Sequence, residues 1–231
     1  MISRVLNLLF PSRCPLCGSL SDDHLHNSIC SACFGSIERY KGPSCRACGV
    51  PTVSSHTGLC KSCTEDPPPI SAIVYYGVYE GALREAIHLL KYGGIRRLGK
   101  PLSALPTALP FPDADVIVPV PLHRRRLLAR EFNQTAVLGH YLSKSLGIPL
   151  SLTALIKTRE TPRQTEMTGR ERLRTLSNSF AVTGDVTDAS VLLVDDVITT
   201  TATVRECAST LRQAGVKQVT AVALARSRPK E

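Results

Sequence analysis

The sequence predicts an α/β protein in which a parallel sheet carries helices on both faces and a small cysteine-rich domain comes first. Three observations support this fold class. From residue 70 onward, short apolar runs typical of buried parallel strands alternate with amphipathic stretches at helical spacing. Gly and Pro residues separate these stretches from one another. Before residue 66, cysteines recur in pairs and large apolar residues are few, so this part cannot fold on an ordinary core.

The elements expected in the second part follow one another in strand–helix order. We predict strands at residues 73–76, 78–79, 115–121, 150–156, 191–194 and 219–225, and helices at residues 80–91, 133–146 and 203–214. Strands that alternate with helices favour a parallel sheet with right-handed crossovers. Asp66 and the three prolines after it predict an extended linker. The expected division is therefore a domain over 1–66 and another over 70–228.

Charge and composition narrow the choice of partners. The 231 residues carry a formal net charge of +9, which favours anionic partners such as nucleotides, pyrophosphate or nucleic acid. A generally basic protein would explain the charge equally well. Aromatic residues make up 5% of the chain and Trp is absent, which argues against extensive stacking on nucleobases. No apolar stretch approaches the roughly 20 residues that cross a bilayer, so we expect no transmembrane segment.

The first ten residues predict a short amphipathic helix that ends before Pro11. This segment is too short for a signal peptide and has no small-residue cleavage site. We therefore expect a cytoplasmic protein whose cysteines stay reduced.

Eight of the nine cysteines form four Cys-x-x-Cys pairs. One such turn supplies two thiolates and a tetrahedral Zn²⁺ needs four, so the eight predict two structural zinc sites. Sequential pairing would group Cys14, Cys17, Cys30 and Cys33 in one site and Cys45, Cys48, Cys60 and Cys63 in the other. A cross-braced pairing is also compatible with the spacing. Disulfides are disfavoured in a reducing compartment, and four redox-active pairs would be redundant.

The strand expected at 191–194 runs into two acids and then a series of hydroxyl residues. The full motif is Asp195, Asp196, Val197, Ile198, Thr199, Thr200, Thr201, Ala202 and Thr203. Ligands of open α/β sheets bind at the carboxyl ends of strands. Adjacent acids suit the 2′- and 3′-hydroxyls of a ribose, directly or through Mg²⁺, and a turn that opens a helix can bind phosphate. The motif predicts a sugar-phosphate site, although in an ordinary strand–turn–helix the acids would only cap the helix.

This motif resembles the phosphoribosyl pyrophosphate (PRPP) motif of type I phosphoribosyltransferases, Asp-Asp-Val-x-Thr-Thr-Gly-x-Thr, with Thr201 in place of its Gly. The chain is most similar to the ComF group, proteins linked to DNA uptake in natural competence. Residues 119–123 match its Pro-Val-Pro-Leu-His, and residues 130–134 match its Arg-Gly-Phe-Asn-Gln, with Glu131 in place of Gly. Because Gly alone adopts positive φ at little cost, Thr201 predicts either a different turn or weaker phosphate binding, and Glu131 a local change.

The resemblance implies a type I phosphoribosyltransferase-like domain behind a double zinc ribbon. It also implies that residues 195–203 bind PRPP with Mg²⁺, and that a flexible loop near residues 157–174 closes over it. The residues implied for the pyrophosphate group and this loop are Arg124, Arg125, Arg126, Arg130, Arg159, Gln164 and Arg172. Solvated basic turns would explain these residues without a ligand. Lys91 could reach an anion, although a solvent-facing lysine is the more ordinary interpretation.

Two hypotheses for the function follow. One is a binding module that keeps the PRPP site and handles incoming single-stranded DNA. The other is an active phosphoribosyltransferase with an unknown acceptor. Thr199 stands where some relatives in the wider superfamily place an acid, so no general base is evident. A further hypothesis is that the zinc ribbons dock a protein such as a helicase.

Overall fold

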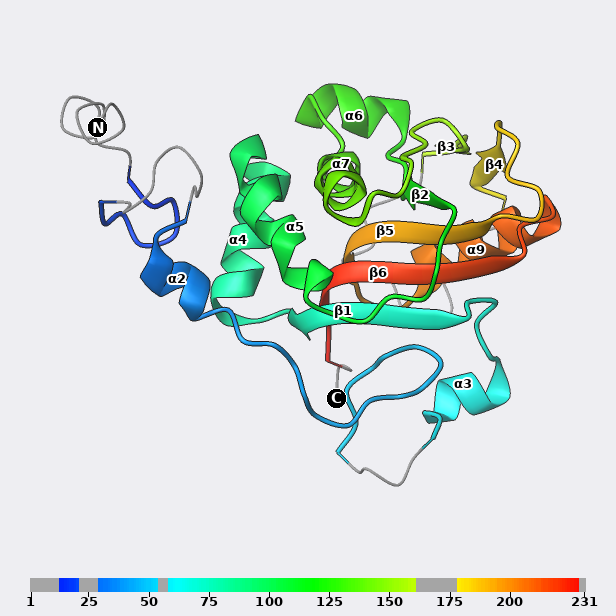
Figure 1. Ribbon diagram of the computed structural model, residues 1–231, viewed down its shortest axis with the longest axis horizontal. Helices are drawn as coiled ribbons and strands as arrows, with labels where there is room; N and C mark the ends of the chain where they lie inside the picture. The colour runs from blue at the N-terminus through cyan, green and yellow to red at the C-terminus, as the bar shows by residue number, and fades with distance from the viewer. Residues whose placement is uncertain (1–12, 21–28, 54–57, 161–177, 229–231) are drawn as a thin grey trace.

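The computed structural model describes residues 13–20, 29–53, 58–160 and 178–228. Its centre is a four-stranded sheet in the order β1–β6–β5–β2 (Figure 1). The strands are β1 (Ala72–Val78), β6 (Gln218–Arg226), β5 (Ser190–Ile198) and β2 (Val116–Pro119). All three pairings are parallel, which confirms the predicted parallel sheet.

Helices cover both faces of this sheet, as predicted (Figure 1). One face carries α4 (Gly81–Tyr92), α5 (Gly99–Thr107) and α7 (Gln134–Leu146), and the opposite face carries α9 (Ala202–Gln213). Leu192 of β5 packs into the first of these cores and Leu193 into the second. A strand buried on both faces needs apolar residues at every position, which explains the uninterrupted run at 191–194.

The sequence also encodes the ends of the helices near the site. Asn133 caps α7, because its side chain accepts a hydrogen bond from the Thr135 N–H at 3.1 Å. The same side chain donates to the Val120 carbonyl at 3.1 Å, which fixes α7 against the end of β2. His123 caps α6 (Arg124–Arg130), a helix that the sequence analysis did not predict.

Four of the expected strands differ from those observed. The two short strands at 73–79 form the single strand β1, which continues through Gly77. At 150–156, Leu150 makes only an isolated parallel bridge to Ile117. The regular strand there is β3 (Leu155–Lys157), antiparallel to β4 (Phe180–Val182). The motif strand β5 continues beyond residue 194 to Ile198, because β6 is long enough to pair with it throughout.

The cysteine-rich region packs directly on the sheet and contains two short helices, α2 (Ser31–Gly35) and α3 (Lys61–Glu65). Its Ile29 and Ile37 share a core with α4, which supplies the apolar partners that the region itself lacks. The Tyr40 N–H donates to the Tyr76 carbonyl of β1 at 2.8 Å. A Cβ on Gly77 would come within 2.8 Å of the Glu38 carbonyl oxygen, so glycine is needed where the two backbones meet.

The expected boundary between 66 and 70 is bridged by Arg205 of α9, which forms an ion pair with Asp66. The division into 1–66 and 70–228 therefore stays a prediction. Within the described ranges, no helix has both the length and the hydropathy to span a membrane. The helix predicted at 1–10, together with Gln164 and Arg172, lies outside the described residues.

Candidate functional site

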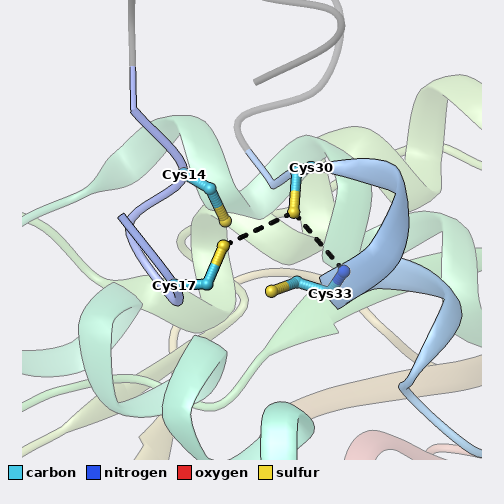
Figure 2. Close-up of side chains that lie close together, drawn as sticks. All are labelled: Cys14, Cys17, Cys30 and Cys33. Carbon is cyan, nitrogen blue, oxygen red and sulfur yellow. Dashed lines mark hydrogen bonds between the residues drawn. The ribbon is translucent and has the colours of Figure 1, made fainter. Parts of the chain in front are cut away.

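The eight paired cysteines form two clusters in the sequential arrangement; Figure 2 shows the first. The members are Cys14, Cys17, Cys30 and Cys33, and Cys45, Cys48, Cys60 and Cys63, and within each cluster the ligand atoms lie within 4.8 Å of one another. The Sγ atoms of Cys17 and Cys30 are 3.7 Å apart, as are those of Cys48 and Cys60. Two thiolates on one tetrahedral zinc lie about 3.8 Å apart. The sulfur spacing therefore fits Zn²⁺ and excludes the cross-braced pairing.

Local backbone geometry prepares both clusters for a cation. The Cys33 N–H donates to the Cys30 Sγ at 3.5 Å, and the Cys60 N–H donates to the Cys45 Sγ at 3.3 Å. Such bonds stabilise thiolates. Burial raises the pKa of Cys63, and the neighbouring charge of Cys48 raises it further. Four adjacent thiols ionise together only when a metal compensates their charge, so the clusters are suited to structural zinc.

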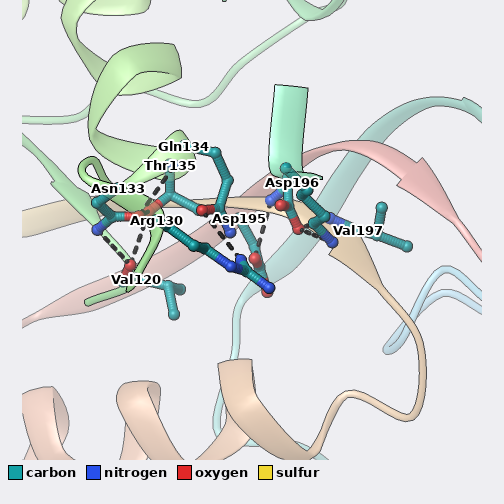
Figure 3. Close-up of polar contacts among 9 residues, drawn as sticks. Val120, Arg130, Asn133, Gln134, Thr135, Asp195, Asp196 and Val197 are labelled. Carbon is teal, nitrogen blue, oxygen red and sulfur yellow. Dashed lines mark hydrogen bonds and ion pairs between the residues drawn. The ribbon is translucent and has the colours of Figure 1, made fainter. Parts of the chain in front are cut away.

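Asp195 and Asp196 lie within β5, and their side chains leave the strand in different directions (Figure 3). Asp196 is 3% exposed, and its Oδ1 lies 2.8 Å from the Lys91 Nζ of α4. The same oxygen accepts a hydrogen bond from the Val197 N–H at 2.7 Å. Its Oδ2 is buried without a hydrogen-bond partner among the described residues. Lys91 is thus the ion-pair partner of Asp196, and the interpretation of it as a solvent-facing lysine was wrong.

Asp195 has different surroundings. Its Oδ1 accepts a hydrogen bond from the Asp196 N–H at 2.8 Å, and its charge acts on Lys157 of β3 and Cys207 of α9. Burial and the Asp196 carboxylate raise the pKa of Asp195 to about 7. Burial lowers the pKa of Lys157 to about 8, and the positive charge of Arg126 adds to that effect. Asp195 therefore changes its charge near neutral pH.

The turn after β5 encloses a hollow of about 40 Å³, lined by Asp195 and by residues 197–204. Such a volume holds ordered water or small polar groups. Asp196 is not among the lining residues. The hollow lies at the N-terminus of α9, where backbone N–H groups and the helix dipole favour an anion. The structure thus brings Asp195 and the hydroxyl residues of the motif together, whereas Asp196 points away.

Both residues that replace a family glycine keep the glycine-like backbone conformation. Thr201 has φ +63° and Glu131 has φ +64°, which costs a non-glycine residue about 1–2 kcal/mol. The turn at Thr201 therefore does not avoid the conformation, and neither does the turn at Glu131. The Glu131 carbonyl accepts a hydrogen bond from Arg96 at 2.8 Å, which helps to hold that turn.

The described arginines of the predicted pyrophosphate site lie on α6 and near the end of β3. Arg124 and Arg125 are exposed, and Arg125 forms an exposed ion pair with Glu160 at 3.0 Å. Arg130 lies over the Tyr92 ring, 4.8 Å from its centroid, and donates to the Gln134 Oε1 at 3.4 Å (Figure 3). Arg159 is exposed. The charges of Arg126 and of Asp195 both act on Lys157, in opposite directions.

Lys157 and Arg226 were not predicted from the sequence as site residues. Arg226 is buried at the end of β6 and donates to the carbonyls of Ile198 and Thr199. In the sequence, Arg226 is recognisable only as a charged residue directly after an apolar strand. Lys157 gave no signal beyond its place in a basic stretch. For Lys91 the sequence offered contact with an anion as one interpretation, and the anion is the Asp196 carboxylate.

Sequence comparison agrees with this architecture of two Cys₄ clusters and a phosphoribosyltransferase-type sheet. The double zinc ribbon domain family matches residues 5–72, and the phosphoribosyl transferase domain family matches residues 134–231. DNA utilization protein YhgH of Escherichia coli strain K12 is 34% identical over 212 residues, which cover 87% of this chain and 92% of that protein. Competence protein F of Haemophilus influenzae is 29% identical, with 87% and 91% covered. The chain belongs to the ComF family.

Two solved structures show more distant similarity. The glutamine PRPP amidotransferase of B. subtilis, complexed with ADP and GMP, has a TM-score of 0.38 and 23% identity, and the match covers 56% of this chain and 26% of that chain. This chain therefore spans about a quarter of the amidotransferase. The purine phosphoribosyltransferase of Pyrococcus horikoshii has a TM-score of 0.34 and 19% identity, with 59% and 75% covered. The family assignment rests on the sequence relatives.

Proposed function

We propose that this protein binds PRPP with Mg²⁺ at the end of β5 and acts in the uptake and use of DNA. The observation that carries the first part is the hollow lined by Asp195 and the threonine turn at the N-terminus of α9. A carboxylate beside backbone N–H groups and hydroxyls suits a phosphorylated ribose. Thr201 keeps the turn in its glycine-like shape, so phosphate binding weaker than that of a turn with glycine stays the prediction.

In this proposal, different residues of the site bind different groups of the ligand. The 5′-phosphate binds to the turn from Thr199 to Thr203, and the ribose hydroxyls face Asp195. The hard oxygen atoms of Asp195 and of the threonine hydroxyls suit Mg²⁺. When bound, Mg²⁺ would offset the negative charge of the pyrophosphate group. Lys91 keeps Asp196 in place, so Asp196 supports the strand rather than the ligand.

The pyrophosphate group would face the arginines of α6 and Arg159. Arginine forks match phosphate oxygens. Of these residues, Arg126 has a charge that acts on Lys157, the lysine on which the charge of Asp195 also acts. Gln164 and Arg172 complete the predicted set by resemblance alone.

The role in DNA uptake rests on the names of the relatives, a DNA utilization protein and competence proteins. Single-stranded DNA is the second ligand that we propose, because the chain carries a net charge of +9 and exposes Arg124 and Arg125 on one helix. A cytoplasmic location belongs to the same proposal. The described surface gives no feature that identifies a helicase, so that hypothesis stays a prediction.

Turnover of PRPP is the alternative function. A transferase would need a group that accepts a proton from the acceptor nucleophile. Thr199 and Thr200 are the exposed residues of the turn, and a threonine hydroxyl is a poor base. Asp195 is the carboxylate at the same hollow, and in this proposal it faces the ribose hydroxyls and is not assigned as the base. Release of pyrophosphate from PRPP in the presence of nucleobases or amines would establish the alternative instead.

Calorimetry with PRPP and Mg²⁺ tests the proposed ligand. We expect wild-type protein to bind and Asp195→Asn to lose at least about tenfold in affinity, or about 1.4 kcal/mol. Asp113→Asn is the matched control, because Asp113 is an exposed acid outside the site. Absence of binding by wild-type protein, or equal binding by Asp195→Asn, contradicts the proposal. For DNA, affinity in moderate salt that is unchanged by Arg124→Ala with Arg125→Ala contradicts the second ligand.

A further inference from the structure

One buried arginine connects the second cysteine cluster to the phosphate turn. Arg226, the last residue of β6, is 3% exposed. Its Nε donates to the carbonyl oxygen of Cys48 at 3.0 Å. Its Nη1 donates to the carbonyl oxygen of Ile198 at 2.9 Å and to that of Thr199. The guanidinium therefore bonds to the backbone of a cluster cysteine at one end and to the first residues of the turn at the other.

The buried guanidinium of Arg226 also needs a compensating negative charge. Within the described ranges, none of the ion pairs involves Arg226, and an uncompensated buried charge is strongly destabilising. The nearby thiols that act on its charge are those of Cys48 and Cys60. A Cys₄ site loaded with Zn²⁺ carries a net charge of about −2, so it supplies the missing negative charge. Without zinc, the turn at Cys45–Cys48, which presents the Cys48 carbonyl to Arg226, loses the metal bonds that order it.

We propose that Arg226 positions the phosphate turn according to the zinc occupancy of the second cluster, Cys45, Cys48, Cys60 and Cys63. Loaded with zinc, the cluster holds the guanidinium, and the guanidinium holds the carbonyls of Ile198 and Thr199. Loss of zinc releases Arg226 and loosens the turn. Arginine suits this role because its rigid fork donates in several directions at once, which a lysine ammonium on a flexible stem does not reproduce.

The first cluster provides a contrast within the same chain. Its Cys14 and Cys30 belong to the core that contains α4 residues, and the segment after it bonds to β1 through Tyr40. None of the hydrogen bonds found for its described residues reaches the turn at 198–203. Zinc in the first cluster should therefore leave the order of the turn unchanged.

Hydrogen–deuterium exchange of the ligand-free, zinc-loaded protein tests the proposal without relying on the proposed function. We expect amides at 198–203 to exchange several-fold faster in Arg226→Lys and Arg226→Gln than in wild type. The variants should still hold two zinc ions per chain, and the exchange of the β2 amides of Val116, Ile117 and Val118 should be unchanged. If the amides at 198–203 exchange at the wild-type rate in both variants, the proposal is overturned.

Matched cysteine variants test the dependence on zinc. Cys60→Ser and Cys30→Ser change the third cysteine of the second and first cluster. We expect faster exchange at 198–203, and about tenfold weaker binding of PRPP with Mg²⁺, in Cys60→Ser and not in Cys30→Ser. Adding Arg226→Lys to Cys60→Ser should cause no further loss. The coupling is contradicted if the two cysteine variants affect the turn equally. It is also contradicted if the losses caused by Cys60→Ser and Arg226→Lys are fully additive.

Coupling between two sites is reciprocal, so bound PRPP should slow the release of zinc to a chelator from the second cluster and not from the first. Release from the second cluster that is unaffected by saturating PRPP contradicts the proposal. This ligand measurement rests on the proposed function. If wild-type protein does not bind PRPP, the proposed function fails, and the exchange experiments still decide whether Arg226 couples zinc to the turn.

Discussion

Asp195 and Asp196 are identical residues, adjacent in one strand, with different surroundings. Asp196 is buried against Lys91 at 2.8 Å, whereas Asp195 borders the hollow at the N-terminus of α9. The cause is the alternation of side chains along β5, which continues through both residues. The comparison teaches that an acid pair at the end of a strand can combine one ligand-binding carboxylate with one structural carboxylate.

Replacing Asp196, the structural carboxylate, should have the largest effect on stability. Asp196→Asn leaves the Lys91 ammonium buried without its counter-charge, so we expect the free energy of unfolding to fall by about 3 kcal/mol. Urea unfolding of the zinc-loaded protein measures the change. Lys91→Met added to Asp196→Asn should restore part of the loss, because the buried ammonium is then removed. A change below about 0.5 kcal/mol in Asp196→Asn would show that the ion pair contributes little.

Replacing Asp195, the ligand-binding carboxylate, should have the opposite effect on stability. The folded-state pKa of Asp195, raised to about 7, exceeds the value near 3.9 expected in the unfolded chain. The folded state thus binds more protons between pH 4 and 7, and the free energy of unfolding falls as pH rises through that range. At pH 8 the burial cost is fully present, so Asp195→Asn should stabilise the protein by about 1–2 kcal/mol. Destabilisation at pH 8 would contradict the different roles of the two acids.

The same pKa predicts how ligand affinity depends on pH. If the ionised form of Asp195 binds PRPP with Mg²⁺, the affinity of wild-type protein should fall up to about tenfold per pH unit below pH 7. The residual affinity of Asp195→Asn should be much less sensitive to pH in that range. Calorimetry between pH 5.5 and 8 checks both curves. Parallel curves for the two proteins would show that another group controls the dependence.

The smallest effect is expected in the turn that follows both acids. Thr201→Gly removes the cost of a left-handed threonine, about 1–2 kcal/mol, and adds about 0.5–1 kcal/mol of backbone entropy cost. We therefore expect a net stabilisation of about 0.5–1 kcal/mol in thermal or urea unfolding. Thr200→Gly, one residue earlier and without a positive φ, is the control and should not stabilise. Equal effects at the two positions would show that Thr201 is not strained.

The sequence predicted what depends on local pattern. Apolar runs revealed the parallel strands, and cysteine spacing revealed the two clusters. The role of Asp196 could not be predicted, because it depends on the distant Lys91 and on how far β5 continues. That length is decided by β6, which pairs with β5 up to Ile198. Arg226 was missed for the same reason, since its partners come from the second cluster and from the turn.

A crystal structure of the zinc-loaded protein with PRPP and Mg²⁺ tests the different roles of the two acids most directly. The account predicts the ribose or the metal within bonding distance of the Asp195 carboxylate, the 5′-phosphate on the turn at 199–203, and Asp196 still paired with Lys91. Ligand bound elsewhere, or Asp196 released from Lys91 to share the ligand equally with Asp195, would contradict it.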